Sequence, residues 1–312
     1  MSCIRGREGH YHLGELLGRG GFACAYRARY VGREGERDVC LKIPICREDV
    51  RTVHEEARVL AAIDDVNVVR WVETIELDDG RVALVLELVD GVPLSALMSR
   101  RTGGALPTAA AAAEVGARVC RAFLAATRAV PGGVVHRDVC PHNVLVARDG
   151  AVKLTDFGVA RARDRERWTG RSCIKAKLSY ASPEQLLGAD LDARSDLFSL
   201  GVVLYEFLSG VHPFAGESPR ARAHTVLTGP APAPLSEHGA LGEILAQLLE
   251  RVRGQRAQCS EALAERFERI AGDSGRTELA RRVCLRRPGL ARARPHAEGV
   301  ARRNFARFGS TA

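Results

Sequence analysis

Three polar side chains in the middle of the chain have the types and spacing needed to move a phosphoryl group. Asp138 and Asn143 lie in segment 136–143, which reads His-Arg-Asp-Val-Cys-Pro-His-Asn, and Asp156 opens an Asp-Phe-Gly turn eighteen residues beyond Asp138. A carboxylate can accept the proton of an attacking hydroxyl. Carboxylate and amide oxygens are also the ligands that Mg²⁺ prefers when it bridges phosphates. We therefore predict that Asp138 accepts the proton and that Asn143 and Asp156 hold the metal.

A glycine-rich turn near the N-terminus provides a place where phosphates can bind. Gly18 and Gly20 lie between two strand-like segments, 11–17 and 22–30, so this turn belongs to a hairpin and not to a strand-to-helix connection. Glycines lack a Cβ atom, which lets backbone N–H groups approach phosphate oxygens closely. A plain flexible hairpin would show the same residues, so the turn indicates a phosphate site only together with other motifs.

Lys42 ends a short apolar run, 39–42, and a lysine inside an apolar strand needs an anionic partner. Glu56 is one candidate, because it lies on the apolar face of a helix predicted over 50–63 by its 3.6-residue period. The phosphates of a nucleotide are the other candidate. An ordinary lysine at the edge of a sheet is the plain alternative.

The elements that must position these residues form two groups. Strand-like segments fill roughly the first ninety residues, at 11–17, 22–30, 39–43, 68–77 and 81–89. Helices are predicted after residue 91, over 107–129 and over 195–209. We expect Ser195 to cap the later helix and Gly210 to end it, and its apolar surface on nearly all sides predicts burial. A β-rich lobe followed by a helical lobe, with a cleft between them, is the predicted layout.

The distribution of charge suggests a folded body followed by a basic tail. We divide the 312 residues into an N-lobe, 1–91, a C-lobe, 92–272, and an arginine-rich tail, 273–312. From residue 275 onward ten arginines face only two glutamates, so the net charge of +8 is placed in this tail. We expect the tail to be flexible and to contact an acidic partner. The rest of the chain is nearly neutral and gives no sign of nucleic-acid binding.

Composition is that of an ordinary globular protein, with 46% apolar and 27% charged residues. Nine scattered cysteines form neither a Cys-x-x-Cys pair nor a Cys/His cluster, which favours reduced thiols in the cytoplasm over a disulfide framework or a zinc site. The N-terminus has no secretory signal, and no apolar run approaches the roughly 20 residues of a membrane span. Only four of the 46 basic residues are lysines, at positions 42, 153, 175 and 177, so each lysine is informative.

Taken in order along the chain, these motifs resemble those of bacterial Hanks-type (eukaryotic-like) serine/threonine protein kinases, from about residue 10 to residue 265. Ser182-Pro183-Glu184 is similar to the end of a kinase activation segment, and Arg256 is the implied partner of Glu184. The resemblance implies an α+β, bilobal protein-kinase-like fold, with a small antiparallel β-rich N-lobe carrying one key helix and a larger, mostly α-helical C-lobe. It also implies ATP and Mg²⁺ as cofactors, and transfer of the γ-phosphoryl group to Ser or Thr hydroxyls of proteins, the kinase itself included.

The same resemblance implies an adenine site between the two lobes. Glu87 and Val89 would bind adenine through their backbone, next to Leu86 as gatekeeper. The residues expected around the nucleotide are Leu17, Gly18, Gly20, Ala25, Cys40, Lys42, Glu56, Glu87, Val89, Leu145 and Asp156. His136 and Phe157 resemble links of the regulatory spine.

Four features depart from the family pattern. Ala23 replaces the third glycine of the turn, and the loop that leads into the helix over 50–63 is shorter than usual. Cys140 stands where these kinases carry a lysine that touches the transferred phosphate, and Lys177 stands where they carry a threonine that bonds to the catalytic aspartate. If the segments pack as usual, Lys177 could reach back toward Asp138 and restore the missing charge. Drift in an enzyme that is losing its activity is one alternative, and a solvent-facing Lys177 is another. The predicted catalytic set is Asp138, Lys42, Asn143 and Lys177.

Two other classes of protein share part of this pattern. A pseudokinase or docking scaffold that binds nucleotide would account for Cys140 in place of the usual lysine. Such a protein would not need the proton acceptor and both metal ligands, which this sequence keeps. A small-molecule phosphotransferase of related fold shares both aspartates but is not expected to have Ser182-Pro183-Glu184. We favour the active protein kinase.

The segment between Asp156 and Glu184 is predicted to regulate activity. Thr169 and Ser172 are the expected sites of autophosphorylation. Arg137, in the catalytic loop, can pair with a phosphate on this segment and order it. A solvated basic loop that needs no modification is the alternative.

Overall fold

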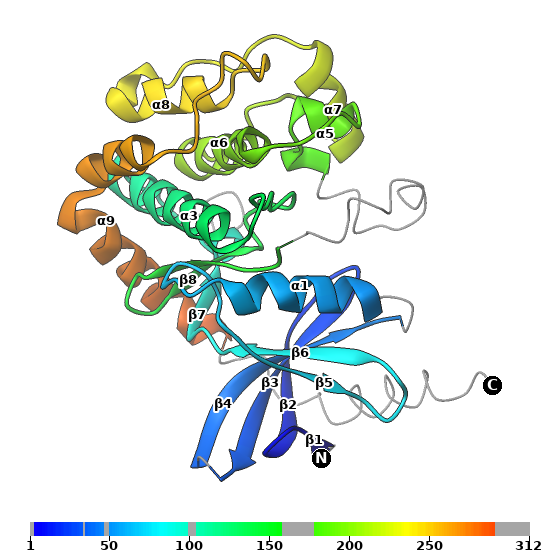
Figure 1. The fold of residues 1–312 in the computed structure, drawn as a ribbon. Helices are drawn as coiled ribbons and strands as arrows, with labels where there is room; N and C mark the ends of the chain where they lie inside the picture. The colour runs from blue at the N-terminus through cyan, green and yellow to red at the C-terminus, as the bar shows by residue number, and fades with distance from the viewer. Residues whose placement is uncertain (1–2, 34, 47–49, 99–103, 158–177, 291–312) are drawn as a thin grey trace.

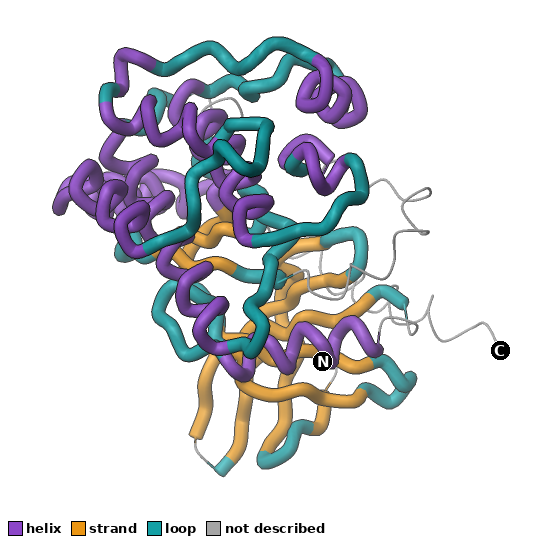
Figure 2. Tube along the Cα trace, turned by 45° about the horizontal axis from the view of Figure 1, so that its top comes forward, coloured by secondary structure: helices purple, strands orange, loops and turns teal. Residues whose placement is uncertain are grey.

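The computed structural model describes residues 3–33, 35–46, 50–98, 104–157 and 178–290, which form a β-rich lobe and a helical lobe (Figure 1). In Figure 2 the strands gather at one end of the molecule and most of the helices at the other. The predicted α+β, bilobal fold is therefore confirmed.

The N-lobe is built on one antiparallel sheet with the strand order β1-β2-β3-β4-β6-β5. Its strands are β1 Cys3–Arg5, β2 Gly9–Arg19, β3 Ala23–Gly32, β4 Gly35–Pro44, β5 Trp71–Glu76 and β6 Val82–Glu87. The sequence predicts all of these but β1, whose three residues are too few to show a period and are ordered by pairing with β2.

Helix α1, Val50–Ala62, packs its apolar face against this sheet. Val53, Leu60 and the following Ile63 are buried there, and Glu56 is buried among them. The apolar face of α1 predicted from the 3.6-residue period is thus confirmed. Because Glu56 lies on this face, its carboxylate is in the interior of the protein.

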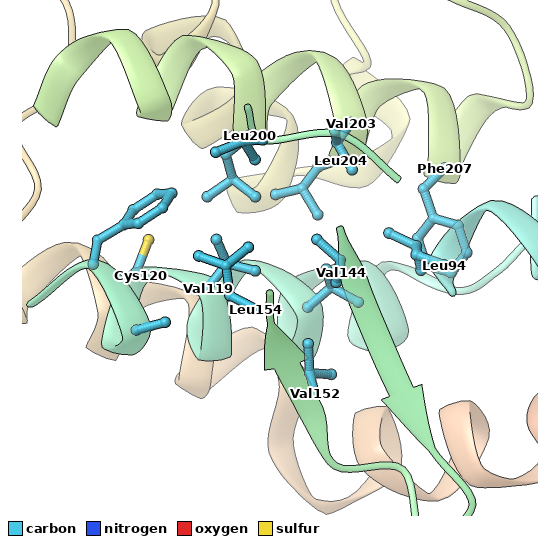
Figure 3. Packing of buried hydrophobic residues seen from close by; sticks show 14 of the residues in the cluster. Leu94, Val119, Cys120, Val144, Val152, Leu154, Leu200, Val203, Leu204 and Phe207 are labelled. Atoms are coloured by element: carbon cyan, nitrogen blue, oxygen red, sulfur yellow. The ribbon is translucent and has the colours of Figure 1, made fainter. Parts of the chain in front are cut away.

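The C-lobe contains a short second sheet and the larger helices. Its elements are β7 Gly91–Pro93, η2 Leu94–Ala96, α3 Ala109–Ala129, β8 Val144–Ala147, β9 Val152–Leu154, η5 Leu178–Tyr180, α5 Pro183–Leu186, α6 Ala193–Ser209, α7 Pro219–Thr228, η6 Ser236–His238, α8 Ala240–Leu248 and α9 Glu261–Leu290. Figure 3 shows Val119 of α3, Leu204 of α6 and Val144 of β8 in one apolar core. This core supports the hairpin β8–β9. Asn143 directly precedes β8, and Asp156 follows β9.

Helix α6 is buried on nearly all sides, as predicted, but its N-cap is Asp192 and not Ser195. The Asp192 carboxylate accepts a hydrogen bond from the Arg194 backbone N–H at 2.9 Å, so the helix begins before Ser195. Aspartate and serine cap helices about equally well, so the sequence alone does not choose between them. Gly210 ends the helix with φ of 74°, in the left-handed region that favours glycine.

Helix α9 crosses the boundary that the sequence suggests at residue 272. The chain bends at Gly272 and then continues as a helix to Leu290, packed along α3 (Figure 1). Leu279 and Val283 are fully buried in the core, because every third or fourth residue of this arm faces α3. The Thr108 hydroxyl, at the start of α3, donates a hydrogen bond to Glu278.

The arm of α9, residues 273–290, therefore corrects the expected flexible tail in this region. Five of the ten C-terminal arginines belong to the helix, so the basic excess is not confined to a segment outside the folded body. Arg276 pairs with Asp149 at 2.5 Å, and Arg282 pairs with Glu278 at 2.7 Å. Residues 291–312 lie outside the described part of the chain.

Replacing the buried Leu279 by alanine should destabilise the protein by about 2–5 kcal/mol, the usual cost of a cavity in a core. Leu285, on the same arm but 68% exposed, offers a matched control whose change to alanine should cost less than about 0.5 kcal/mol. Urea unfolding of the two variants measures both values. Equal losses in the two variants would contradict the packing of this arm.

None of the helices in the described ranges has the length and apolar character needed to cross a membrane.

Candidate active site

Lys42 joins three elements of the two lobes through its ammonium group. Its Nζ donates to Glu56 Oε1 at 2.7 Å, to Glu56 Oε2 at 2.9 Å and to Asp156 Oδ1 at 2.7 Å. Strand β4 supplies the lysine and α1 supplies Glu56, while Asp156 follows β9. Burial disfavours the charged ammonium, but Asp156 and then Glu56 outweigh it and raise the pKa of Lys42 above its ordinary value. The lysine is thus held charged and in place.

Asp138 and Asn143 lie together in the catalytic loop, both buried. The Asn143 amide nitrogen donates to the Asp138 backbone carbonyl at 2.8 Å and to Asp138 Oδ2 at 3.0 Å. These bonds orient the Asp138 carboxylate. They also leave the Asn143 carbonyl oxygen, Oδ1, as the atom of that side chain that can bind a metal.

Asp196, on the buried helix α6, holds the catalytic loop by its backbone. Its carboxylate accepts the N–H of His136 at 2.7 Å and the N–H of Arg137 at 2.8 Å. Burial raises the pKa of Asp196 to about 7, against the lowering effect of these two bonds. Arg137 has φ of 65°, a strained conformation for a residue other than glycine, and the bonds from Asp196 help to hold it.

His136 and Phe157 are in contact, with ring centroids 4.6 Å apart, and both are buried. His136 Nε2 also lies 3.0 Å from the Thr155 carbonyl oxygen. The contact joins the catalytic loop to the turn that carries Asp156, which itself has φ of 63°. This is the neighbourhood that the resemblance to a regulatory spine implies for the two residues.

The residues expected around adenine lie on strands of both sheets. Ala25 of β3 pairs with Lys42, and Cys40 of β4 pairs with the buried Leu86 of β6. Leu145 lies on β8, in the sheet at the junction of the lobes. Burial, and secondarily Asp156, raise the pKa of the Cys40 thiol to about 11, so this cysteine is a neutral, apolar surface.

The remaining predicted nucleotide residues lie along β2 and at the end of β6. Gly18 of β2 pairs with Ala25, and the Gly20 N–H donates to the Ala23 carbonyl at 2.8 Å, which closes the glycine-rich turn. Leu17, beside this turn, is 47% exposed. The Glu87 backbone N–H donates to the Arg70 carbonyl, and the half-buried Val89 follows two residues later.

The donor set at Asn143 and Asp156 fits Mg²⁺. A hard cation that bridges phosphates needs one or two protein oxygens and takes its other ligands from phosphate and water. Within the described residues no group of three or more His, Cys, Asp or Glu side chains could hold a metal. The site therefore suits a metal that arrives with a nucleotide.

The segment that follows residue 177 is tied to the catalytic loop and to the C-lobe. Glu184 pairs with Arg256 at 2.6 Å and 3.1 Å, as the sequence predicts, and accepts the Ser195 hydroxyl at 2.7 Å. Burial opposes the charge of Glu184, but Arg256 and Ser195 lower its pKa below the ordinary value. Gln185 donates to the Arg137 carbonyl at 2.9 Å.

A family model described as "Protein kinase domain" matches residues 11–267. The chain belongs to the protein kinase family. It is 33% identical to a probable serine/threonine-protein kinase, CPE1738, of Clostridium perfringens over 84% of this chain and 38% of that protein. It is 35% identical to the serine/threonine-protein kinase PknB of Mycobacterium tuberculosis over 77% of this chain, and 36% identical to PknB of Mycobacterium leprae over 69% of it. The alignments span 35% to 39% of the lengths of these relatives.

Three of the predicted residues, Lys177, Thr169 and Ser172, lie outside the described residues, as does the whole of segment 158–177. Cys140 is described and is 6% exposed in the catalytic loop. None of the eight cysteines within the described ranges forms a disulfide bond.

Sequence reasoning missed three contacts near the site of this kinase. The first contact is that of Asp196 with the His136 and Arg137 backbone, and the signal for it was an acid in an otherwise apolar helix, which needs an internal partner. The Tyr180 hydroxyl donates to Glu206 at 2.8 Å, and no local pattern reveals that pair. Lys153 pairs with Glu87, and the rarity of lysine in this chain was the available signal.

Proposed function

We propose that this kinase domain transfers the γ-phosphoryl group of ATP to Ser and Thr hydroxyls of proteins, itself included. The observation that carries the proposal is the Lys42 ammonium held between Glu56 and Asp156, together with the hydrogen-bonded pair of Asp138 and Asn143 in the catalytic loop. Lys42 is suited to hold nucleotide phosphates, and Asp138 to accept the proton of the incoming hydroxyl. Asn143 and Asp156 would hold Mg²⁺, which neutralises phosphate charge when bound. Positioning and charge supply most of the catalysis in such reactions.

The alternatives account for less of this arrangement. A pseudokinase or docking scaffold has no need for a proton acceptor oriented by an amide, as Asp138 is by Asn143. A small-molecule phosphotransferase has no need for a platform after the catalytic loop, such as the one that Glu184, Gln185 and Arg256 build here. These contacts of Glu184, Gln185 and Arg256 therefore favour a protein as the substrate over a small molecule.

Three further assignments complete the proposal. We assign Lys177 as the cation that replaces the lysine missing at Cys140, a role supported by the chemistry of the transferred phosphate and by the scarcity of lysine. A cytoplasmic location is supported by the requirement of the proposed reaction for ATP, which is present in the cytoplasm. An acidic partner of the arginine-rich segment 273–312 is supported by its ten arginines against two glutamates.

The purified protein, given γ-labelled ATP and Mg²⁺, should label its own Ser or Thr residues. Mass spectrometry should find phosphate on Thr169 or Ser172, where a negative charge can pair with Arg137 and order the segment. Asp138→Asn is the control. It should lower labelling by roughly a hundredfold or more, since it removes the proton acceptor.

Equal labelling by wild type and Asp138→Asn would contradict the assignment of Asp138. Nucleotide binding without any labelling would favour the pseudokinase. Phosphate found only elsewhere in the active enzyme would favour the solvated basic loop that needs no modification.

A further inference from the structure

Lys153 forms an ion pair that spans the junction of the two lobes. Its Nζ lies 2.6 Å from Glu87 Oε1, and the two side chains are only 20% and 23% exposed. Lys153 belongs to β9 of the C-lobe hairpin, and Glu87 is the last residue of β6 in the N-lobe. The proposed mechanism gives Lys153 no role. It is nevertheless one of only four lysines in a chain that otherwise uses arginine.

The Glu87 carboxylate is fixed by a second contact besides the lysine. Its Oε1 also accepts the Arg70 backbone N–H at 2.8 Å, while the Glu87 N–H donates to the Arg70 carbonyl at 2.9 Å. The carboxylate is therefore oriented before it meets Lys153. An ion pair between groups already held in place loses little side-chain entropy on forming.

The backbone that carries Lys153 is fixed on the other side of the junction. Within the hairpin Lys153 pairs directly across from Leu145, one of the residues expected around the nucleotide. The neighbouring Leu154 donates its N–H to the Asn67 carbonyl at 2.7 Å and accepts the Val69 N–H at 2.9 Å. Strand β9 is thus bonded to the N-lobe as well as to β8.

We propose that Lys153 is a positioning residue for the nucleotide. Its pair with Glu87 sets the distance between the backbone at Glu87–Val89 and the Leu145 side chain, the two surfaces that would enclose adenine. This inference rests on the proposed function, because it takes the cleft to be the ATP site. Lys153 lies on a different strand from Lys42 and contacts neither Asp138 nor Asn143 in the described hydrogen bonds. Its loss is therefore expected to weaken nucleotide binding and to spare the chemical step.

The test compares four variants of the whole chain. Lys153→Met keeps the length of the side chain without its charge, Lys153→Arg keeps the charge, and Glu87→Gln weakens the pair from the other side. Arg29→Met is the matched control, because Arg29 pairs with Glu36 on the sheet that carries Glu87, but both of these side chains are more than half exposed. The dissociation constant of Mg·ADP is measured for each, together with KM for ATP and kcat.

Lys153→Met and Glu87→Gln should each raise the dissociation constant and KM roughly tenfold, a usual effect of losing a hydrogen bond to a charged group. The kcat at saturating ATP should stay within about twofold, as expected when only ground-state binding is lost. Lys153→Arg should recover most of the affinity. Arg29→Met should leave both constants unchanged, since exposed pairs contribute little.

Several results would overturn the inference. A lowered melting temperature with unchanged nucleotide affinity in Lys153→Met would show a purely structural pair. A lowered kcat with unchanged KM, or no recovery in Lys153→Arg, would equally exclude a positioning role. A wild-type protein that binds no nucleotide overturns the proposed function and this inference with it. If wild type binds and the variants bind equally well, this inference alone fails.

Discussion

Replacing Asp156 by alanine is expected to lower phosphoryl transfer by about a thousandfold or more and to leave the fold intact. The side chain is 31% exposed and follows strand β9, so it adds little to the core. Its loss removes a metal ligand but leaves the pair between Lys42 and Glu56 in place. Lys42→Ala should lower transfer to a similar extent. It should also lower stability, because the nearly buried Glu56 loses its ammonium partner.

Initial rates at saturating Mg·ATP and thermal unfolding of both variants separate these effects. Arg27→Ala is the control, since Arg27 lies on the neighbouring strand β3 and pairs with Asp38 at the surface. It should retain wild-type rates. Full activity in Asp156→Ala or in Lys42→Ala at saturating nucleotide would remove the basis for the proposed site.

Lys177→Thr is expected to lower kcat by roughly 10- to 1000-fold, the scale for loss of one group that stabilises charge in a transition state. The transferred phosphoryl group carries negative charge on its equatorial oxygens, and a cation beside it lowers the barrier. At Cys140 the catalytic loop offers a thiol, which is too weakly polar to supply that cation. The double variant Cys140→Lys with Lys177→Thr should recover much of the rate, because it rebuilds the usual family arrangement.

The four proteins of this cycle give a coupling energy with an expected sign. Lys175→Thr, two positions earlier in the sequence, is a matched control that should keep kcat within about twofold. If the changes at Cys140 and Lys177 are simply additive, the proposed replacement is wrong. Lys177 would then serve in substrate docking or in no catalytic role.

The local motifs of the sequence were sufficient to identify the proposed catalytic residues. Asp138 and Asn143 lie within one short loop, so their spacing along the chain already limits their distance in space. Glu56 could be assigned to the interior because a 3.6-residue period places it on the apolar face of its helix. The end of α6 at Gly210 was likewise a local property, since glycine adopts the left-handed conformation without steric cost.

Only the tertiary structure decided which distant groups meet. The start of α6 at Asp192 and the packing of the α9 arm depend on neighbours that a local pattern does not contain. Lys153 and Glu87 are 66 positions apart, and their contact exists because β9 is bonded to the N-lobe beside the end of β6. A period in the sequence records which face of an element is apolar, whereas the partner of that face depends on how all the elements pack together.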